Sequence, residues 1–278
     1  MGQIAGSMKA GELTIAPGAQ IFRPESTQAS LEAAIAAAVA GNGDVILLKR
    51  GGIEVSSTVA FAKSGLRVIA VDDGMNPLAR GEFNGIFAAS GFTDGPAAKV
   101  TAPTSFDGVA FVSRDTGATF FDGAALLLGG DADANPFGVW LKNCRFPKWG
   151  LDNRFGISIE GSSDCLVEDC TFEGVGSALE AGIYLQGAMQ NITIRNNVFR
   201  QCTAAVKCGT FTGSPDGPHL LMHGNFVEDG LVLDTDGNPG LGLIADNYSE
   251  LVTGSSYDRA VATLQGVGWQ FSGNHYKE

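Results

Sequence analysis

The sequence predicts an all-β fold, a single-stranded parallel β-helix of about nine coils that one N-terminal α-helix caps. Three observations carry this prediction. A short phrase recurs six times, apolar and polar residues alternate within it, and a second alternating series keeps the same period. A repeat of about 22 to 28 residues, built from short alternating segments with turn residues between them, is typical of a strand solenoid.

The recurring phrase is a short strand followed by a bend and a closing aromatic residue. Its copies span residues 139–146, 165–172, 192–199, 219–226, 241–248 and 269–276. Alignment on the closing aromatic predicts one inward column: Leu141, Val167, Ile194, Leu221, Leu243 and Phe271. The aromatics form a second column: Phe146, Phe172, Phe199, Phe226, Tyr248 and Tyr276. Stacked at roughly 4.8 Å per coil, such columns bury a core that no single coil buries alone.

Asn143, Asp169 and Asn196 share one place at the bend, where a polar side chain can bond backbone groups that the turn leaves unpaired. With this feature the phrase resembles the coil of right-handed parallel β-helices of the pectin-lyase-like class, including their asparagine ladder. The resemblance implies a right-handed coil.

A second strand series lies between the phrases, at residues 156–161, 182–187, 205–209 and 230–234. Its agreement in period with the first series strengthens the fold prediction. Alternation places two outward columns on it. One column is Ser158, Tyr184, Lys207 and Val232, and the next is Glu160, Gln186, Gly209 and Asp234.

Three regions follow one another along the chain. Residues 1–25 mix short apolar pieces with Gly and Pro, which indicates an extended arm that either docks on a neighbour or is poorly ordered. Residues 26–43 predict a helix that Ser26 or Thr27 caps. Its apolar residues keep helical spacing: Leu31, Ala34, Ile35, Ala38 and Val39. We expect this helix to cover the open end of the first coil, because residues 44–278 form the β-helix.

The opening of the coils, residues 44–71, also resembles that of pectin-lyase-like proteins, phage tailspikes included. It departs from them at Lys49 and Arg50, where the family usually has a Pro after the first strand.

Composition limits the partners. The 278 residues are 44% apolar and carry a net charge of −12, so the chain has material for a core but would be repelled by nucleic acid and by anionic membranes. No stretch reaches the roughly 18 apolar residues of a membrane span, and the first 15 residues lack the pattern of a secretion signal. We therefore expect synthesis in a host cytoplasm.

No catalytic site is predicted outright. The resemblance implies that an enzyme of this class acts from the outer face of the second series, where Tyr184, Lys207 and Asp234 are the candidates for an acid and a base. Glu160 and Asp234 lie three coils apart, roughly 14 Å. Glycoside hydrolysis needs a closer pair of carboxylates.

Two loops resemble a cation site. Asp131 and Asp133 in one loop, and Asp234 and Asp236 in the other, alternate as calcium ligands do, although ordinary Asx turns give the same pattern. No other cofactor is implied. Cys144 and Cys170 occupy the same place in successive coils, which allows either a disulfide or two packed thiols.

An apolar strip is predicted on the outside of the rod: Trp140, Leu166, Leu220, Met222 and Ile244. Such a strip marks something packed against it, either a neighbouring subunit or the chain's own arm. By resemblance to trimeric tailspikes, we expect a homotrimer. Further virion proteins would bind through the arm or through the open C-terminal end.

Together these features favour a non-enzymatic structural or adhesive protein of a phage-like virion, either a capsid decoration or a tail-associated spike. Two alternatives remain. One is a polysaccharide lyase or glycoside hydrolase of the pectin-lyase-like class, and the other is a carbohydrate-binding module without turnover.

Overall fold

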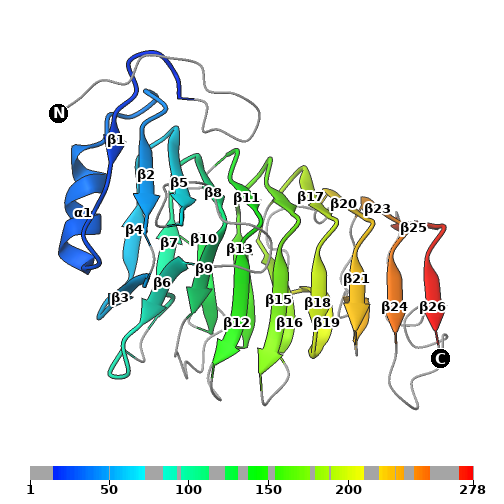
Figure 1. The fold of residues 1–278 in the computed structure, drawn as a ribbon. Coiled ribbons are helices and arrows are strands. Elements are labelled where there is room, and N and C mark those ends of the chain that lie inside the picture. The colour runs from blue at the N-terminus through cyan, green and yellow to red at the C-terminus, as the bar shows by residue number, and fades with distance from the viewer. Residues whose placement is uncertain are drawn as a thin grey trace.

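The structure is a computed structural model. It describes residues 15–49, 51–72, 84–92, 95–112, 123–130, 137–149, 154–175, 179–187, 189–209, 219–228, 230–234, 241–250 and 269–277. These residues form a rod of stacked coils with a helix at its N-terminal end (Figure 1). No helix in the described part of the chain is long and apolar enough to cross a membrane.

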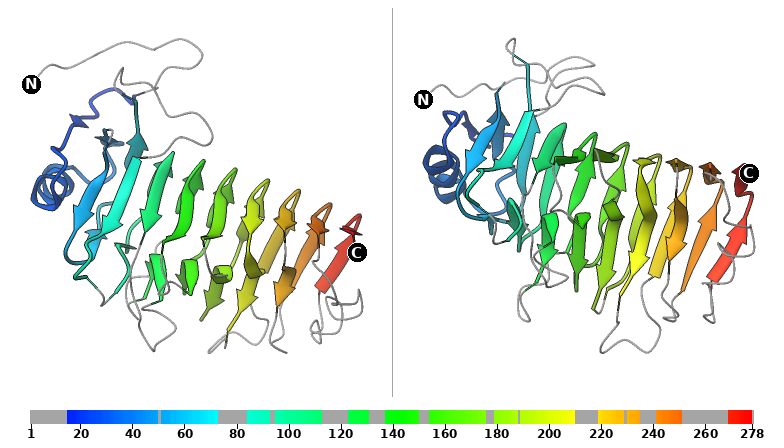
Figure 2. Two further views of the ribbon diagram at one scale, coloured as in Figure 1. Left: turned by 60° about the horizontal axis from the view of Figure 1, so that its bottom comes forward. Right: turned by 90° about the horizontal axis from the view of Figure 1, so that it is seen from below.

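Three parallel sheets form the faces of the rod, as the views in Figure 2 show. Sheet A contains β1 (Ile21–Phe22), β2 (Val45–Leu48), β5 (Leu66–Ala70), β8 (Thr104–Asp107), β11 (Trp140–Lys142), β14 (Leu166–Glu168), β17 (Ile192–Arg195), β20 (His219–His223), β23 (Leu241–Ala245) and β25 (Trp269–Ser272). Sheet B contains β3 (Ile53–Val55), β6 (Asn84–Ala88), β9 (Val109–Val112), β12 (Arg145–Trp149), β15 (Thr171–Val175), β18 (Val198–Arg200), β21 (Phe226–Glu228), β24 (Tyr248–Glu250) and β26 (His275–Lys277). Sheet C contains β4 (Val59–Phe61), β7 (Ala98–Val100), β10 (Ala124–Gly129), β13 (Phe155–Glu160), β16 (Leu179–Gln186), β19 (Cys202–Cys208) and β22 (Leu231–Asp234).

Each strand pairs with the corresponding strand of the next coil. The nine strands that the structure describes in sheet B confirm the prediction of about nine coils. The predicted phrase supplies one strand of sheet A and one of sheet B in each coil, and the second series supplies sheet C.

The predicted capping helix is α1 (Gln28–Ala37). The Thr27 hydroxyl accepts a hydrogen bond from the Ser30 amide, which satisfies one of the unpaired donors of the first turn. Leu31, Ala34 and Ile35 are buried against the first coil, so the helix closes the N-terminal end of the core. Val39 is exposed beyond the helix end.

The described part of the arm docks on its own chain. Strand β1 adds to the edge of sheet A beside β2. Asp44 is buried, and its carboxylate accepts hydrogen bonds from the Gln20 and Val39 amides and from the Asn42 side chain. One carboxylate therefore ties the arm to the end of α1 and to the first strand.

The bend after each sheet A strand is a left-handed residue. Asn143, Asp169 and Asn196 share this bend, as predicted, and have φ of 51°, 54° and 56°. Gly224 and Asp246 continue this position in later coils, with φ of 66° and 54°. Asn and Gly suit it because they adopt positive φ at little cost.

The asparagine ladder lies one residue further along than predicted. Its members are buried or nearly so: Asn197, Asn225, Asn247 and Asn274. Each Oδ1 accepts from the backbone N–H of the preceding coil, at 2.8–3.0 Å. Each Nδ2 donates to a carbonyl of the preceding coil's sheet A strand, at 2.7–3.2 Å. The ladder thus satisfies backbone groups that the bend leaves unpaired inside the core.

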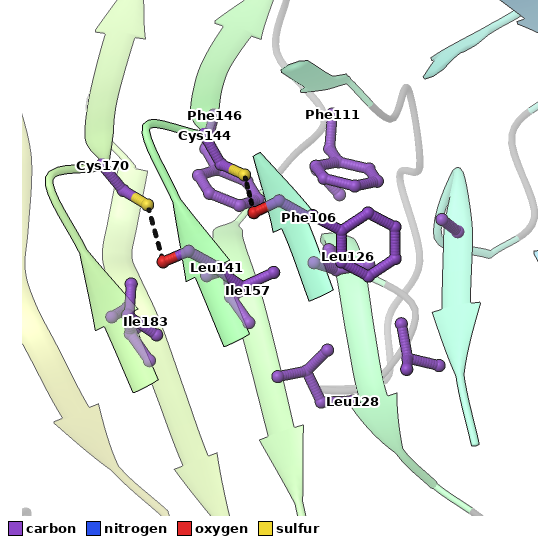
Figure 3. Close-up of a cluster of buried hydrophobic side chains, with 14 of the residues drawn as sticks. Phe106, Phe111, Leu126, Leu128, Leu141, Cys144, Phe146, Ile157, Cys170 and Ile183 are labelled. Carbon is purple, nitrogen blue, oxygen red and sulfur yellow. Dashed lines mark hydrogen bonds between the residues drawn. The ribbon is translucent and has the colours of Figure 1, made fainter. Parts of the chain in front are cut away.

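Cys144 and Cys170 hold the ladder position in earlier coils. Both are free and buried, so the packed-thiol alternative holds and the disulfide does not. Figure 3 shows that each thiol donates to a carbonyl of the preceding coil, Cys144 to Phe106 and Cys170 to Leu141. A thiol here makes the same inter-coil contact as the ladder amide.

The predicted inward column is wrong at two of its six members. Leu141, Val167 and Ile194 are buried, but Leu221 and Leu243 are exposed. Ile194 pairs with Met222, and Met222 with Ile244, so these two copies are shifted by one residue against the aromatic alignment. Phe271 pairs with the buried Ile244 and so keeps the inward column, although it is exposed in the last coil that the structure describes. A slip of one residue moves every side chain to the opposite face.

Candidate functional site

Sheet C carries an outward column that contains the three catalytic candidates. In register across four strands lie Ser158, Tyr184, Lys207 and Asp234. Asp234 pairs with Lys207 in register. Alternation along the sequence had placed Val232 beside Lys207 and Asp234 in the next column. Val232 is instead buried in the core. The structure therefore brings Tyr184, Lys207 and Asp234 closer together than alternation predicted.

An aromatic cluster covers this face beside the column. Phe155 and Tyr184 stack at 4.6 Å between ring centroids, and the Arg154 guanidinium lies 5.3 Å from the Phe155 ring centre. Small residues complete the cluster: Ala124, Ala181 and Ala204. Tyr184 is only 3% exposed.

Gly209 makes room for the tyrosine hydroxyl. A Cβ atom at this position would collide with the Tyr184 Oη atom and ring. The hydroxyl is thus fixed against backbone at the end of β19, and it does not project into solvent.

A three-membered ion network lies next to the cluster. Lys207 Nζ donates to Glu180 Oε1 at 2.7 Å, while Arg154 donates to Glu180 Oε2 through Nη2 and, at 2.7 Å, through Nε. Burial alone would raise the pKa of Glu180, but the hydrogen bonds from Lys207 and Arg154 outweigh it and lower the pKa below its ordinary value. Glu180 is therefore an anion at neutral pH and holds both cations in place.

This arrangement limits what the column can do chemically. A general base must reach the proton that it removes. The Lys207 ammonium is bound to Glu180, and the Tyr184 hydroxyl is buried. Ser158 is also fully buried, and within the described structure its hydroxyl has no hydrogen-bond partner. The hydroxyls of Tyr184 and Ser158 are therefore covered, whereas the side chains of Lys207, Glu180 and Arg154 are partly exposed, at 21%, 28% and 33%.

Sequence reasoning missed Glu180 and Arg154. The strands begin earlier than the alternation indicated, β16 at Leu179 and β13 at Phe155. Glu180 therefore looked like a loop residue, and Arg154 lies directly before the first residue of β13. Their opposite charges at similar places in successive coils were the available signal.

Sheet A carries the second candidate surface, and the predicted strip needs correction there. Leu220, Met222 and Ile244 are buried in the core, so the prediction that they face outward is wrong. Trp140 is 58% exposed and Leu166 half-buried, as expected for an outward position. The error is the same one-residue shift that affects the inward column.

The outward column of sheet A is Trp140, Leu166, Thr193, Leu221 and Leu243. Thr193 interrupts its apolar character. Leu221 and Leu243 are 37% and 38% exposed, and Leu241 is exposed nearby. We call these three residues, Leu221, Leu241 and Leu243, the C-terminal apolar patch.

A groove of about 450 Å³ lies on the same sheet at the other end of the column. Strands β5, β8 and β11 form its floor, and Trp140 stands beside it. Its polar side chains include Arg67, Ser105, Asp107 and Lys142.

Most of the candidate calcium ligands lie outside the residues that the structure describes. Asp131, Asp133 and Asp236 lie outside the described residues, while Asp234 ends β22. Among the described residues no group of three or more His, Cys, Asp or Glu side chains is placed to hold a metal ion.

Known proteins share this architecture. The model for the right-handed β-helix region matches residues 124–257. No curated protein matches the chain. An alginate lyase from Paenibacillus sp. str. FPU-7 is similar at a TM-score of 0.54 and 13% identity, over 93% of this chain and 98% of that one.

Two further structures are similar. A variant of the PL6-family alginate lyase AlyGC has a TM-score of 0.56 at 15% identity and covers the whole chain, which spans only 41% of that enzyme's length. ORF18 of Geobacillus virus E2 has a TM-score of 0.49 at 12% identity, over 92% of this chain and 61% of that one. The chain thus has the fold of a right-handed parallel β-helix.

Proposed function

We propose that this β-helix is a non-enzymatic structural protein that assembles side by side with further copies of itself, as a homotrimer. The observation that carries the proposal is the C-terminal apolar patch. Its leucines follow one another in successive coils, so the patch runs along the rod. An exposed apolar surface of this kind marks a contact with another molecule.

The direction of the patch favours a second copy as its occupant. Copies that lie with their axes parallel contact one another along the length of the rod, and repeating coils offer the same spacing, about 4.8 Å, on both sides. A closed threefold arrangement buries one such patch per copy around its axis. Polar surface beside the patch would complete the roughly 800 Å² per partner that stable interfaces bury.

The state of sheet C supports the non-enzymatic part of the proposal. Tyr184 is buried, and Lys207 is bound to Glu180. On the resemblance of residues 44–71 to the opening of phage tailspikes, we place the trimer in a phage-like virion, as a capsid decoration or a tail-associated spike.

Light scattering on the purified chain tests the assembly. We expect a mass about three times that of one 28.8 kDa chain. Leu221→Asp with Leu243→Asp should give a folded monomer, since two carboxylates cannot be buried in an apolar contact. Gln201→Asp with Thr203→Asp adds the same charge at exposed sites away from the patch and should leave the trimer intact. A wild-type monomer at micromolar concentration contradicts the proposal.

A second candidate function is polysaccharide cleavage. The specific observation for it is the column that joins Tyr184, Lys207 and Asp234, with Arg154 beside it, in a fold that alginate lyases share. A cation, a phenol and an amine are groups that β-elimination next to a uronate carboxylate can use. Incubation with alginate and pectate, followed by ultraviolet absorbance of the unsaturated product, tests this. Activity that Lys207→Ala and Tyr184→Phe both abolish would replace the structural proposal.

A further inference from the structure

Two histidines border the C-terminal apolar patch. His219 and His223 lie on β20, two residues to either side of Leu221. Leu220 and Met222, which alternate with them, are buried in the core. Because successive side chains of a strand point to opposite faces, both histidines and Leu221 share the outer face of sheet A.

The histidines also lie beside the patch across the strands. His219 pairs in register with Leu241, and Leu221 pairs with Leu243. Neighbouring strands lie about 4.8 Å apart, so these side chains are within contact range. Both histidines are half-buried. A second copy that covers the leucines therefore covers the histidines as well.

His223 has a cation in register beside it. It pairs with Arg195 of β17 on one side and with Ala245 of β23 on the other. The Arg195 guanidinium binds Glu168 at 2.9 Å, so this carboxylate already has a cation. Asp246 follows Ala245 at the bend and is exposed to solvent. A proton on His223 therefore adds a second positive charge beside Arg195.

His219 has an apolar residue in register beside it, Leu241 of β23. On the other side Asn191 precedes β17, and its Nδ2 donates to Asp164 Oδ1 at 2.8 Å. Asp164 is itself exposed to solvent. Among the residues that the structure describes, no buried carboxylate is in register with either histidine, so none compensates a positive charge in a covered contact.

Protonation of these histidines opposes the assembly. Histidine is the side chain that ordinarily gains a proton between about pH 8 and pH 5. An apolar contact disfavours the charged form, so protons bind more readily to separate copies than to assembled ones. By linkage, a fall in pH therefore shifts the equilibrium towards separate copies. In a threefold arrangement the histidines of all copies gather around one axis, where their like charges repel one another.

We propose that His219 and His223 make the assembly of this rod pH-dependent, with copies joined through the C-terminal apolar patch at pH 8 and separated at pH 5.5. This switch rests on the proposed function, because the histidines act only where a second copy covers the patch. Separation leaves each copy folded, since both side chains lie on the outer face of sheet A and not in the core.

Sedimentation velocity of the full chain at micromolar concentration and constant ionic strength, at pH 8 and at pH 5.5, tests the proposal. We expect a trimer at pH 8 and an association constant about a hundredfold lower at pH 5.5. In the double variant His219→Gln with His223→Gln, the constants at the two pH values should agree within about threefold, because glutamine stays neutral. His219→Lys with His223→Lys should separate the copies already at pH 8.

The third histidine of the chain provides the matched control. His275 lies on sheet B, where it pairs with Tyr248, away from the patch. His275→Gln should keep the pH dependence of the wild-type chain.

The outcomes separate the switch from the assembly itself. A monomer at pH 8 contradicts the proposed function, and the switch with it. A trimer at pH 8 that persists at pH 5.5 leaves the proposed function intact and overturns the switch. A pH dependence that survives in the glutamine double variant, or that His275→Gln abolishes, overturns the assignment to His219 and His223. Circular dichroism at pH 5.5 checks the fold of each sample, and unfolding at that pH would overturn a switch that separates folded copies.

Discussion

The two halves of the stack place different residues at the ladder position and at the aromatic position of each coil. In the coils of β11 and β14, Cys144 and Cys170 hold the ladder position, and the inward aromatics Phe146, Phe172 and Phe199 stack in the core. Asparagine holds that position from the coil of β17 onward, and in the coils of β20 and β23 the aromatics have moved to the outer face. Phe226 and Tyr248 still stack there, at 5.3 Å, but are only half-buried.

The difference shows which feature sets the register. Val227 occupies the place of Phe199 in the next coil, because Asn225 pairs with Asn197 and one residue fewer separates it from the aromatic. Coils align on the left-handed bend and the polar ladder. The aromatic residue is free to face either side, since a ring can stack on its neighbour inside the core or outside it.

The largest expected loss of stability comes from removing a ring of the inner aromatic stack, and it should exceed the loss from removing a ring of the outer stack. Phe172 lies between Phe146 and Phe199, at 4.8 and 4.7 Å, and is fully buried. Phe172→Ala leaves a cavity and should lower the free energy of unfolding by about 3–5 kcal/mol. Phe226→Ala, on the outer stack, should cost about 1 kcal/mol. Urea denaturation measures both, and equal losses would show that the two stacks are equivalent.

The next effect tests the amide ladder. Asn225→Ala removes the acceptor of the Asn197 amide and the donor to Ile194, and both of these backbone groups are buried in the ladder. We expect a loss of about 3 kcal/mol in the free energy of unfolding. The control is Asn196→Gly, at the adjacent left-handed bend, where Gly224 already serves in the next coil. It should change stability by less than about 0.5 kcal/mol, and a loss as large as that of Asn225→Ala would place the stabilising role in the bend.

Alkaline pH distinguishes thiols from amides. Burial raises the pKa of Cys165 from 9.0 to about 12, and burial also raises the pKa values of Cys170 and Cys208. Because the folded values are raised, this stability is fully present below pH 9.0 and is lost as pH rises towards the folded values. Each such thiol should cost about 1.4 kcal/mol per pH unit in that window.

Urea midpoints at successive pH values measure this effect. Cys208→Ala should reduce the slope of unfolding free energy against pH by the contribution of one thiol. The amide ladder does not titrate, so Asn225→Ala should leave the slope unchanged. A native protein whose five cysteines react with a thiol reagent below pH 9.0 as fast as free cysteine would contradict the burial argument.

The alternation of apolar and polar residues predicted the facing of side chains correctly where only one alignment was possible. Ile192 and Ile194 flank a polar Thr193, so alternation placed both correctly in the core. The later copy His219-Leu-Leu-Met-His223 has three consecutive apolar residues, and alternation alone cannot decide which of them faces inward. Alignment on Asn225 would have resolved it, while alignment on Phe226 gave the wrong face.

The candidate sites could likewise be predicted only as far as the pattern within each strand allowed. Tyr184 and Lys207 were placed in one column because their two strands both alternate cleanly. Their burial, and the Glu180 that binds Lys207, depend on side chains from neighbouring coils, whose pairing the sequence does not state. The groove beside Trp140 joins three strands of three coils and has no local signature at all.

The smallest expected effect asks whether the two ladder types are interchangeable. Cys170 already donates its backbone N–H to Asn197 Oδ1 at 2.8 Å, and its thiol points to the Leu141 carbonyl at 3.6 Å. In Cys170→Asn, an amide can donate to the same carbonyl and to Asn197, which extends the ladder by one coil. We expect stability to change by less than about 1 kcal/mol, because better hydrogen bonds offset the burial of a more polar group.

The reverse change, Asn225→Cys, should cost about 2 kcal/mol, since a thiol is a weak acceptor for the Asn197 amide. Equal and large losses from both exchanges would mean that each half of the stack is fitted to its own ladder residue.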